Sequence, residues 1–427
     1  MRVVRTMVTL LTGAALSLGL TGALPLSVGS STAADDFYET PANQELKVRG
    51  PGLLANDTAS PTSIVTFGGD GPHHGGLSWH VGMREGEFDY TPLPGYVGFD
   101  TFTYCLVSRQ PSPCESAVAT VIIRVGDPVV SRLAGADRFE GAAAVARSTN
   151  PVRSGFVFIA SGENFPDALG AAPAAGKFGF ALLLVTKAGV PDATRAELER
   201  LKPGEAIVVG GPAAVSESVL GELRDILPSG ASVSRIGGRD RYEVSRVLAE
   251  QLYGEAPHSF TVTGANFADA LSAGSAAGAA HEPVVLLDGR ADVADGETQA
   301  AFLNLSTSSI TIVGGTEAVS SGVESTLQTI ATVDRLAGSD RYEAAVGVAR
   351  KNVMTSATAV IATGTNYPDA LVGANLAAQR GAPLYLSPGS CVPTAVLADL
   401  ARVGASEIVL LGGERALSPE VAALKHC

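Results

Sequence analysis

Residue types that build metal centres are scarce in this chain. Its 427 residues include only four cysteines, six histidines, four methionines and one tryptophan. No Cys-x-x-Cys pair occurs and no histidine cluster accompanies the cysteines, so the common zinc-site spacings are absent. The sequence therefore predicts no metal and no cofactor, and its even, sparse set of cysteines suits structural disulfides.

Charge is also limited and one-sided. Charged residues make up 17% of the chain and the formal net charge is −13; removing Arg2 and Arg5 with an N-terminal signal gives −13 − 2 = −15. This balance argues against a nucleic-acid partner and against non-specific attraction to anionic surfaces. Beyond the N-terminus, no apolar run reaches the roughly 18 to 20 residues of a membrane span.

The first residues have the composition of a secretory signal peptide. Arg2 and Arg5 precede an apolar stretch, and the small residues Thr32, Ala33 and Ala34 follow it. We expect a signal peptide over residues 1–34 and an exported, secreted protein. No cysteine lies near the expected cleavage region, so a lipid anchor is not expected.

Three stretches of nine residues are near copies of one another. They begin at Arg132, Arg235 and Arg335, so they are 235 − 132 = 103 and 335 − 235 = 100 residues apart. This spacing is about the size of a small domain and too long for a solenoid turn. Three further segments follow each copy in the same order: Asn-aromatic-Pro/Ala-Asp-Ala-Leu, an apolar run and a Gly-Gly pair. This order predicts three repeated units over 128–233, 234–333 and 334–427.

Hydrophobic periodicity assigns each unit to the α/β class. In unit 1 we expect buried strands at 156–160, 181–185 and 206–209 and helices from Pro166, over 192–201 and over 216–227. Continuous apolar strands between amphipathic helices indicate a parallel sheet covered on both faces. Ser216, Ser320 and Ser418 align as N-caps of the last helix of each unit.

Residues 35–127 have a different pattern. Period-two alternation between Gly and Pro turns predicts an all-β sandwich. The whole chain is therefore expected to be multidomain. Within this part we pair Cys105 with Cys114, and at the C-terminus Cys391 with Cys427.

The repeated polar residues allow a structural and a functional interpretation. Asp167 falls in a first helical turn, where its charge favours the helix dipole, and it could pair with a repeated arginine or bind a ligand. The Asp-Arg-aromatic-Glu segment opens a helix, and structural pairing of its Asp and Arg is favoured over contact with a ligand. The structural motif comprises Asp137, Arg138, Asn164, Asp167, Asp240, Arg241, Asn266, Asp269, Asp340, Arg341, Asn366 and Asp369.

A second set of repeated residues supplies ligand-binding candidates. The first arginine of each motif has no carboxylate fixed beside it in sequence, so it could face an anionic ligand. The paired glycines follow a strand and precede a helix, where backbone N–H groups can approach a phosphate or carboxylate, although a tight turn explains them equally well. The candidates are Arg132, Arg235, Arg335, Gly210, Gly211, Gly314, Gly315, Gly412 and Gly413.

Catalytic patterns are not found. No histidine recurs at matching positions of the units, and no Lys-Ser/Thr follows the glycine pairs as a P-loop requires. Ser161 is replaced by Thr263 and Thr363, without a Gly-x-Ser-x-Gly turn. The sequence therefore predicts no catalytic residue and no enzyme, although chemistry confined to one unit remains an alternative.

Taken together, the Arg-Leu-x-Gly-x-Asp-Arg-Tyr, Asn-Tyr/Phe-Pro-Asp-Ala-Leu, apolar-strand and Val-Gly-Gly segments resemble the type-2 cell wall-binding repeats of Gram-positive bacteria. This resemblance implies a pseudo-threefold assembly that binds anionic secondary wall polymers non-covalently. Phe139 and Ala268 depart from the family pattern. The order of elements in residues 35–127 resembles bacterial Ig-like, cadherin-like modules.

The resulting hypothesis is a secreted surface protein held on the cell wall by three repeats, through anionic polymer or peptidoglycan. Its Ig-like module would project as a spacer or an adhesin with a protein or host-surface partner. The alternatives are an enzyme that processes wall glycan or peptide, and a calcium-dependent adhesin. For the latter, the candidate ligands are Asp35, Asp36, Asn56 and Asp57.

Overall fold

The computed structural model describes residues 31–59, 63–79, 86–108, 113–114 and 116–427. Most of the expected signal peptide, residues 1–30, lies outside the described residues. Among the residues that are described, none of the helices combines the length and apolar character that crossing a membrane requires.

The N-terminal part is a β-sandwich. Its sheets have the strand orders β1-β7-β6-β3 and β2-β5-β4, and the rings of Phe88, Tyr90, Phe102 and Tyr104 are fully buried between them. A disulfide joins Cys105 to Cys114, the pair expected from the sequence. The elements are β1 (Asp36–Thr40), β2 (Leu46–Val48), the 3-10 helix η1 (Gly52–Ala55), β3 (Ile64–Phe67), β4 (Gly75–Trp79), β5 (Phe88–Pro92), β6 (Gly98–Val107) and β7 (Ala119–Val125).

The rest of the chain forms three α/β units, each with a four-stranded parallel sheet, as the apolar strands predict. The strands are β8 (Val129–Leu133), β9 (Phe156–Ser161), β10 (Ala181–Val185), β11 (Glu205–Val209), β12 (Ser232–Ile236), β13 (His258–Thr263), β14 (Val284–Leu287), β15 (Ser309–Val313), β16 (Thr332–Leu336), β17 (Thr358–Thr363), β18 (Leu384–Ser387) and β19 (Glu407–Leu411).

Helices follow the strands in the alternating order that the sequence indicates. Of the three serines expected to cap the last helices, Ser320 does so, accepting the N–H of Val323 at 3.1 Å, whereas Ser216 and Ser418 make no such bond. The helices are α1 (Arg138–Thr149), α2 (Pro166–Phe178), α3 (Asp192–Leu201), α4 (Glu217–Ile226), α5 (Arg241–Tyr253), α6 (Ala268–Ala280), α7 (Gly296–Asn304), α8 (Ser321–Leu327), α9 (Arg341–Asn352), α10 (Pro368–Arg380), α11 (Thr394–Val403) and α12 (Pro419–Ala422).

The units interlock by sharing strands. The sheets have the orders β10-β9-β11-β12, β14-β13-β15-β16 and β18-β17-β19-β8. Each fourth strand comes from the segment that begins another unit: β12 pairs with β11, β16 with β15, and β8 with β19 at the opposite end of the chain. The last pairing closes the three units into a ring.

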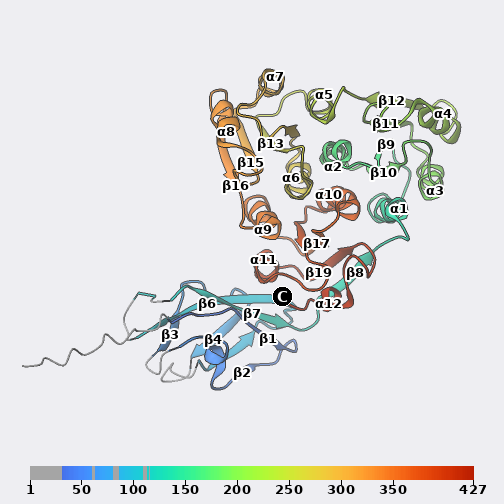
Figure 1. Cartoon of the computed structure of the whole chain (residues 1–427). Helices are drawn as coiled ribbons and strands as arrows, with labels where there is room; N and C mark the ends of the chain where they lie inside the picture. Colours follow the sequence, from blue (N-terminus) through green and yellow to red (C-terminus); the bar gives the residue numbers. More distant parts are fainter. Residues whose placement is uncertain (1–30, 60–62, 80–85, 109–112, 115) are drawn as a thin grey trace, which may run out of the picture.

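Three helices fill the middle of this ring. In Figure 1, α2, α6 and α10 are seen nearly end-on, surrounded by the sheets, and all three pack on one another. Their approach is close because small residues meet there: a methyl group added at Gly176 would lie 2.4 Å from the Cβ of Ala378. Each of the three central helices therefore contacts the other two, while exact pseudo-threefold symmetry stays a prediction.

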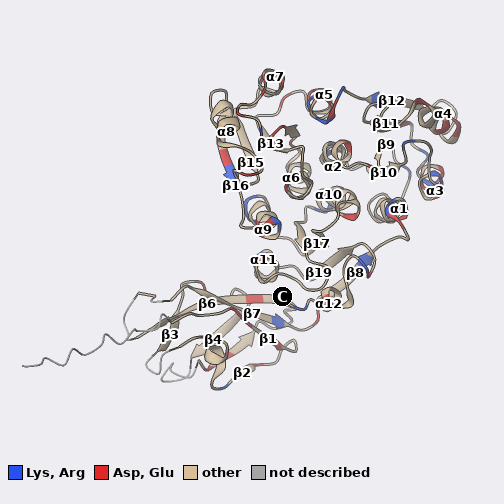
Figure 2. Cartoon of the chain, viewed as in Figure 1, with Lys and Arg blue, Asp and Glu red and all other residues tan. Residues whose placement is uncertain are grey.

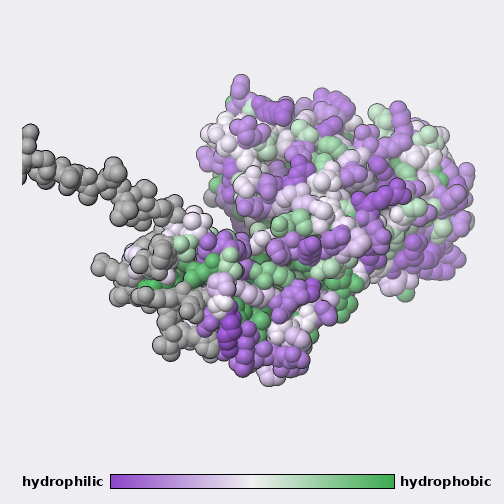
Figure 3. All heavy atoms as spheres, turned by 60° about the horizontal axis from the view of Figure 1, so that its bottom comes forward, coloured by the Kyte–Doolittle hydropathy of each residue, from purple (hydrophilic) through white to green (hydrophobic). Residues whose placement is uncertain are grey.

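The β-sandwich rests on unit 3. Helix α11 packs against β6 and β7, and Phe99 and Ile122 of the sandwich belong to the same buried cluster as Leu397 and Leu400. A second disulfide, Cys391–Cys427, ties the C-terminus beside α11, as expected from the sequence. Figure 3 shows the sandwich seated directly against the ring.

Candidate functional site

Each unit begins its first helix with the same capping arrangement. The Asp137 carboxylate accepts hydrogen bonds from the backbone N–H groups of Phe139 and Glu140, both at 2.9 Å. Glu140 in turn accepts the N–H of Ala136 at 2.8 Å. This reciprocal cap satisfies donors that a helix start otherwise leaves free. The equivalent caps are Asp240 and Asp340.

The arginine beside each cap reaches another unit. Arg138 donates to the carbonyl oxygen of Gly162 in its own unit, and its guanidinium carbon lies 5.6 Å from the centroid of the Tyr367 ring in unit 3. Such cation–π contacts hold a guanidinium against an aromatic face. Two further pairs complete the cycle: Arg241 over Phe165 at 5.7 Å, and Arg341 over Phe267 at 5.8 Å.

The aromatic residues of the three Asn-aromatic motifs meet one another at the centre of the ring. The centroid of Phe165 lies 6.1 Å from that of Phe267 and 5.5 Å from that of Tyr367, and the last two are 5.9 Å apart. Sequence reasoning did not foresee this cluster. Its only signal was the aromatic ring that recurs at one motif position.

The motif aspartates lie across the unit junctions from the motif arginines. Burial raises the pKa of Asp167 to about 6, and Arg241 of the next unit partly opposes that rise. Burial likewise raises the pKa of Asp269, opposed by Arg341, and of Asp369, opposed by Arg138. The three aspartates therefore have the same environment, and a charge interaction joins each unit to the next.

The first glycine of each pair covers one of these carboxylates. Gly210 has a φ of 119°, a conformation that favours glycine, and a Cβ there would lie 2.4 Å from Oδ2 of Asp167. Gly412 has a φ of 101° and stands at the same distance from Asp369. Close packing over the aspartate explains why the first residue of the pair is glycine. The second residue of the pair in unit 3, Gly413, has open space where a Cβ would lie.

The arginines predicted to face a ligand point into the protein. Nη1 of Arg132, Arg235 and Arg335 donates to the carbonyl oxygen of the first glycine of a pair, at 2.7, 2.6 and 2.7 Å respectively. Arg235 also contacts Glu217, and Arg335 contacts Glu324, each through a carboxylate. Their ligand role stays a prediction, and the geometry favours a part in holding the shared strand to its neighbour.

The motifs converge on grooves at the unit junctions. The groove between units 1 and 2 has a volume of 240 Å³, and the groove between units 3 and 1 has a volume of 600 Å³. Both are lined by the Asn-aromatic-Pro-Asp segment and the Gly-Gly turn of one unit and by the Asp-Arg segment of the other. The larger groove includes Gly135, Arg138, Asn366, Asp369, Gly413 and Arg415.

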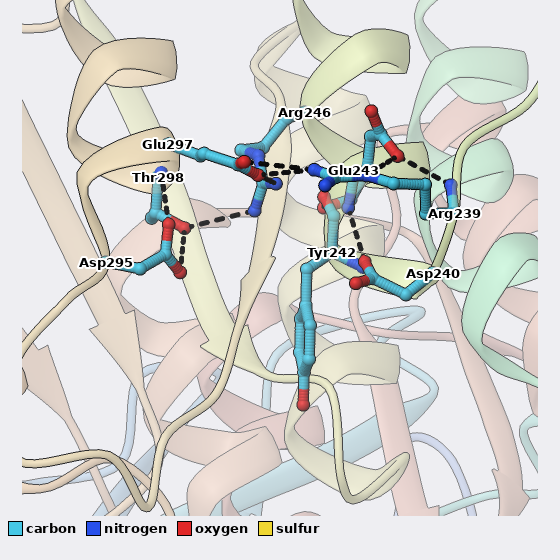
Figure 4. Close-up of polar contacts among 9 residues, drawn as sticks. Arg239, Asp240, Tyr242, Glu243, Arg246, Asp295, Glu297 and Thr298 are labelled. Atoms are coloured by element: carbon cyan, nitrogen blue, oxygen red, sulfur yellow. Dashed lines mark hydrogen bonds and ion pairs between the residues drawn. The ribbon is translucent and has the colours of Figure 1, made fainter.

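The two grooves differ in their exposed arginine. Arg239 in the smaller groove forms ion pairs with Glu243 and Glu297, both at 2.9 Å, as Figure 4 shows. Arg415 in the larger groove is exposed, and within the described part of the chain it has no ion pair. Figure 2 shows charged segments of both signs on the ring. The larger groove thus offers the more available cation.

The acidic residues considered for calcium are held by protein donors. Asp57 accepts the N–H of Ala34 at 2.7 Å and the hydroxyl of Tyr104 at 3.0 Å. Burial raises the pKa of Asp36 to about 7, with Asp57 adding to the rise and Tyr104 opposing it. Asn56 donates to the carbonyl oxygen of Asp35. The calcium alternative stays a prediction.

Over the described ranges, no group of three or more His, Cys, Asp or Glu side chains is arranged to hold a metal ion. His258 contacts Glu282 and Thr311, so its ring nitrogens are occupied by structural partners. The fold and the grooves define a ring of three interlocked α/β units beside a β-sandwich, with the repeated segments gathered at the unit junctions.

The chain belongs to the Cell wall binding domain 2 (CWB2) family, whose profile matches residues 132–220, 235–324 and 335–422. Residues 29–123 match the Bacterial Ig domain family. The predicted family membership and fold class are therefore confirmed, and the protein is a cell wall-binding surface protein.

Two curated relatives from Bacillus subtilis (strain 168) share these repeats. N-acetylmuramoyl-L-alanine amidase LytC is 27% identical over 298 residues, which cover 70% of this chain and 58% of LytC. The protein named Amidase enhancer is 28% identical over 295 residues, covering 69% and 39%. The chain thus matches about half or less of their length.

Two solved structures from Clostridium difficile have the same fold. Cwp6 gives a TM-score of 0.64 at 19% identity, covering 93% of this chain and 68% of Cwp6. Cwp8 gives 0.62 at 21% identity, covering 91% and 68%. Identity this low shows the fold alone.

Proposed function

We propose that the junction grooves bind an anionic secondary polymer of a Gram-positive cell wall without a covalent bond, and that the exported chain is thereby retained on the surface. The observation that carries this proposal is that the segments recurring in every unit line the grooves. Chains of the CWB2 family bind the wall, and these grooves are where the repeated residues of this chain gather.

The buried aspartates make the proposed binding depend on pH. Near neutral pH the Asp167 carboxylate is mostly ionised and opposes an anion in its groove, because its pKa is about 6. Acidification neutralises Asp167 and removes the negative charge that faces Arg241 across the junction. We therefore expect wall binding to strengthen as the pH falls from 7.5 to 5.5.

Repetition of the groove favours retention. A polymer that occupies one groove holds its next segment near another, so the second contact forms at a high effective concentration. Individual grooves can then bind weakly while the whole ring dissociates slowly. We expect the ring to bind whole walls more tightly than short polymer fragments.

The test is co-sedimentation of the secreted chain with purified walls, before and after acid extraction of the secondary polymers. Loss of binding on extraction would support the proposal. Unchanged binding would point to peptidoglycan, and no binding to either preparation would refute wall attachment. Release of soluble muropeptides from the same walls would instead favour the alternative of a wall-processing enzyme.

A charge reversal tests the groove itself. Arg415→Glu places a negative charge in the larger groove, and we expect it to weaken sedimentation by about tenfold, the effect of losing one charge-assisted contact. Arg153→Glu is the matched control, because Arg153 is exposed and lies outside both described grooves. Equal effects of the two variants would show that general charge, not the groove, governs binding.

A further inference from the structure

The outward side of α11 differs from that of its counterparts. Its fourth and eighth residues, Leu397 and Ala401, are 0% and 3% exposed. The same positions of α3 hold Arg195, which is half-buried and paired with Glu222, and Glu199, which is exposed. On α7 the eighth residue is Leu303, which is 58% exposed. Only unit 3 therefore has this helix side both apolar and covered.

The Ig-like module is what covers it. Phe99 and Ile122, on β6 and β7, are 0% and 1% exposed and share a buried cluster with Leu397. Gly98 lets the two backbones approach: a Cβ there would lie 3.2 Å from the carbonyl oxygen of Ala405. Arg124 adds a hydrogen bond of 2.9 Å to the carbonyl oxygen of Ala423. In Figure 3 apolar residues lie along this boundary.

In unit 2, which no module covers, the same region carries an ion pair. Arg246 on α5 forms an ion pair with Glu297 on α7 (Figure 4), and the side chain of Glu297 is 59% exposed. The corresponding residues of unit 3 are Val346 and Ala395, which belong to or pack against the cluster beneath the module. Figure 2 accordingly shows α11 largely without charge.

The covered surface adjoins the seam of the ring. Residues 126–128 are all that separate β7 of the module from β8, the strand that pairs with β19 and joins unit 1 to unit 3. Val130 of β8 packs against the same cluster as Phe99. The module, the closing strand and unit 3 thus share one apolar core.

We propose that the Ig-like module is a clamp that holds the ring closed by covering α11 and fixing β8 against β19. The module then has a structural function besides display, and it is not a freely projecting spacer. The groove between units 3 and 1 lies at the clamped seam, so its shape depends on the module. This inference concerns the fold and does not rest on which polymer the grooves bind.

The experiment uses the full-length chain and the double variant Leu397→Arg, Ala401→Glu. Both new residues are those that α3 carries at these positions, so a solvent-exposed helix accommodates them. Small-angle scattering reports whether the module undocks, and amide hydrogen exchange reports the protection of β8. The strands β12 and β16, which make equivalent pairings without a module, are internal controls. The reverse change on α3, Arg195→Leu with Glu199→Ala, is the matched control.

We expect the module to undock and the amides of β8 to exchange about tenfold faster, with β12 and β16 unchanged, because protection follows local opening. If the module undocks and the amides of β8 exchange at an unaltered rate, the proposal that the module acts as a clamp is refuted. A module that stays docked would overturn the assignment of α11 as its seat.

If the double variant does not fold, Arg124→Ala decides the matter, since the only contact it removes between the module and unit 3 is the hydrogen bond to Ala423; its ion pair with Glu39 lies within the module. We expect faster exchange confined to β8, and no change there would overturn the proposal.

Discussion

Replacing Asp167 by asparagine tests whether a buried, ionised carboxylate weakens the ring at neutral pH. Burial raises the pKa of Asp167 from 3.8 to about 6. The folded protein therefore binds this proton more tightly than the unfolded chain does. The resulting stability is complete below about pH 4 and is lost as the pH rises through about 6.

The magnitude follows from the shift. At about 1.4 kcal/mol for each pKa unit, the full loss is about 3 kcal/mol, of which about 1.4 kcal/mol falls between pH 5 and pH 7.5. Asparagine has nearly the same shape but does not titrate. The variant should therefore gain about 1.4 kcal/mol in unfolding free energy, relative to the natural chain, between these two pH values.

Urea unfolding followed by circular dichroism at pH 5 and pH 7.5 measures the difference. Any loss of hydrogen bonds in the variant is the same at both pH values and cancels. Asp225→Asn, at an exposed position of α4, is the control and should show no such gain. A difference between Asp167→Asn and the natural chain that does not change with pH would refute the electrostatic account of this junction.

Three further changes test other parts of the ring. Gly412→Ala should cost about 1 to 3 kcal/mol, because φ is positive and a carboxylate lies beneath, whereas Gly413→Ala should be nearly neutral; thermal unfolding compares them. The side chain of Glu197 is 1% exposed and pairs with two arginines. Glu197→Gln should therefore cost about 1 to 3 kcal/mol in the same assay, and a neutral result would contradict a structural role. Replacing both Cys391 and Cys427 by serine should cost about 2 to 4 kcal/mol, and reductant should then destabilise the variant less than the natural chain, because only Cys105–Cys114 is left to reduce.

Local elements could be predicted because their signals lie within short stretches. The apolar run at 181–185 became β10 with those bounds, and the spacing at 192–201 became α3. Each was set by periodicity and by flanking turn residues. The cap at Ser320 formed as expected, whereas Ser216 and Ser418 failed, since a suitable residue does not guarantee that its hydroxyl is oriented toward the helix.

The candidate site was only partly foreseeable. The motif around Asp167 was visible as a repeated pattern. The sequence also suggested its two structural roles, a charge that favours the helix dipole and a partner for a repeated arginine. The sequence did not indicate that Arg241 would be the facing arginine, or that Phe165 would meet the rings of two other units. Such partners belong to different units and are brought together only by packing.

The sequence by itself determined the three-fold repetition, the α/β class of each unit, the β-sandwich before them and the family. Only the tertiary structure decided that β8 completes the sheet of unit 3, that the motif segments meet in junction grooves, and that the sandwich rests on α11. The reason is physical. Periodicity specifies an element and its buried face, but many surfaces can bury that face, and the choice among them depends on the complementarity of residues that are distant in the chain.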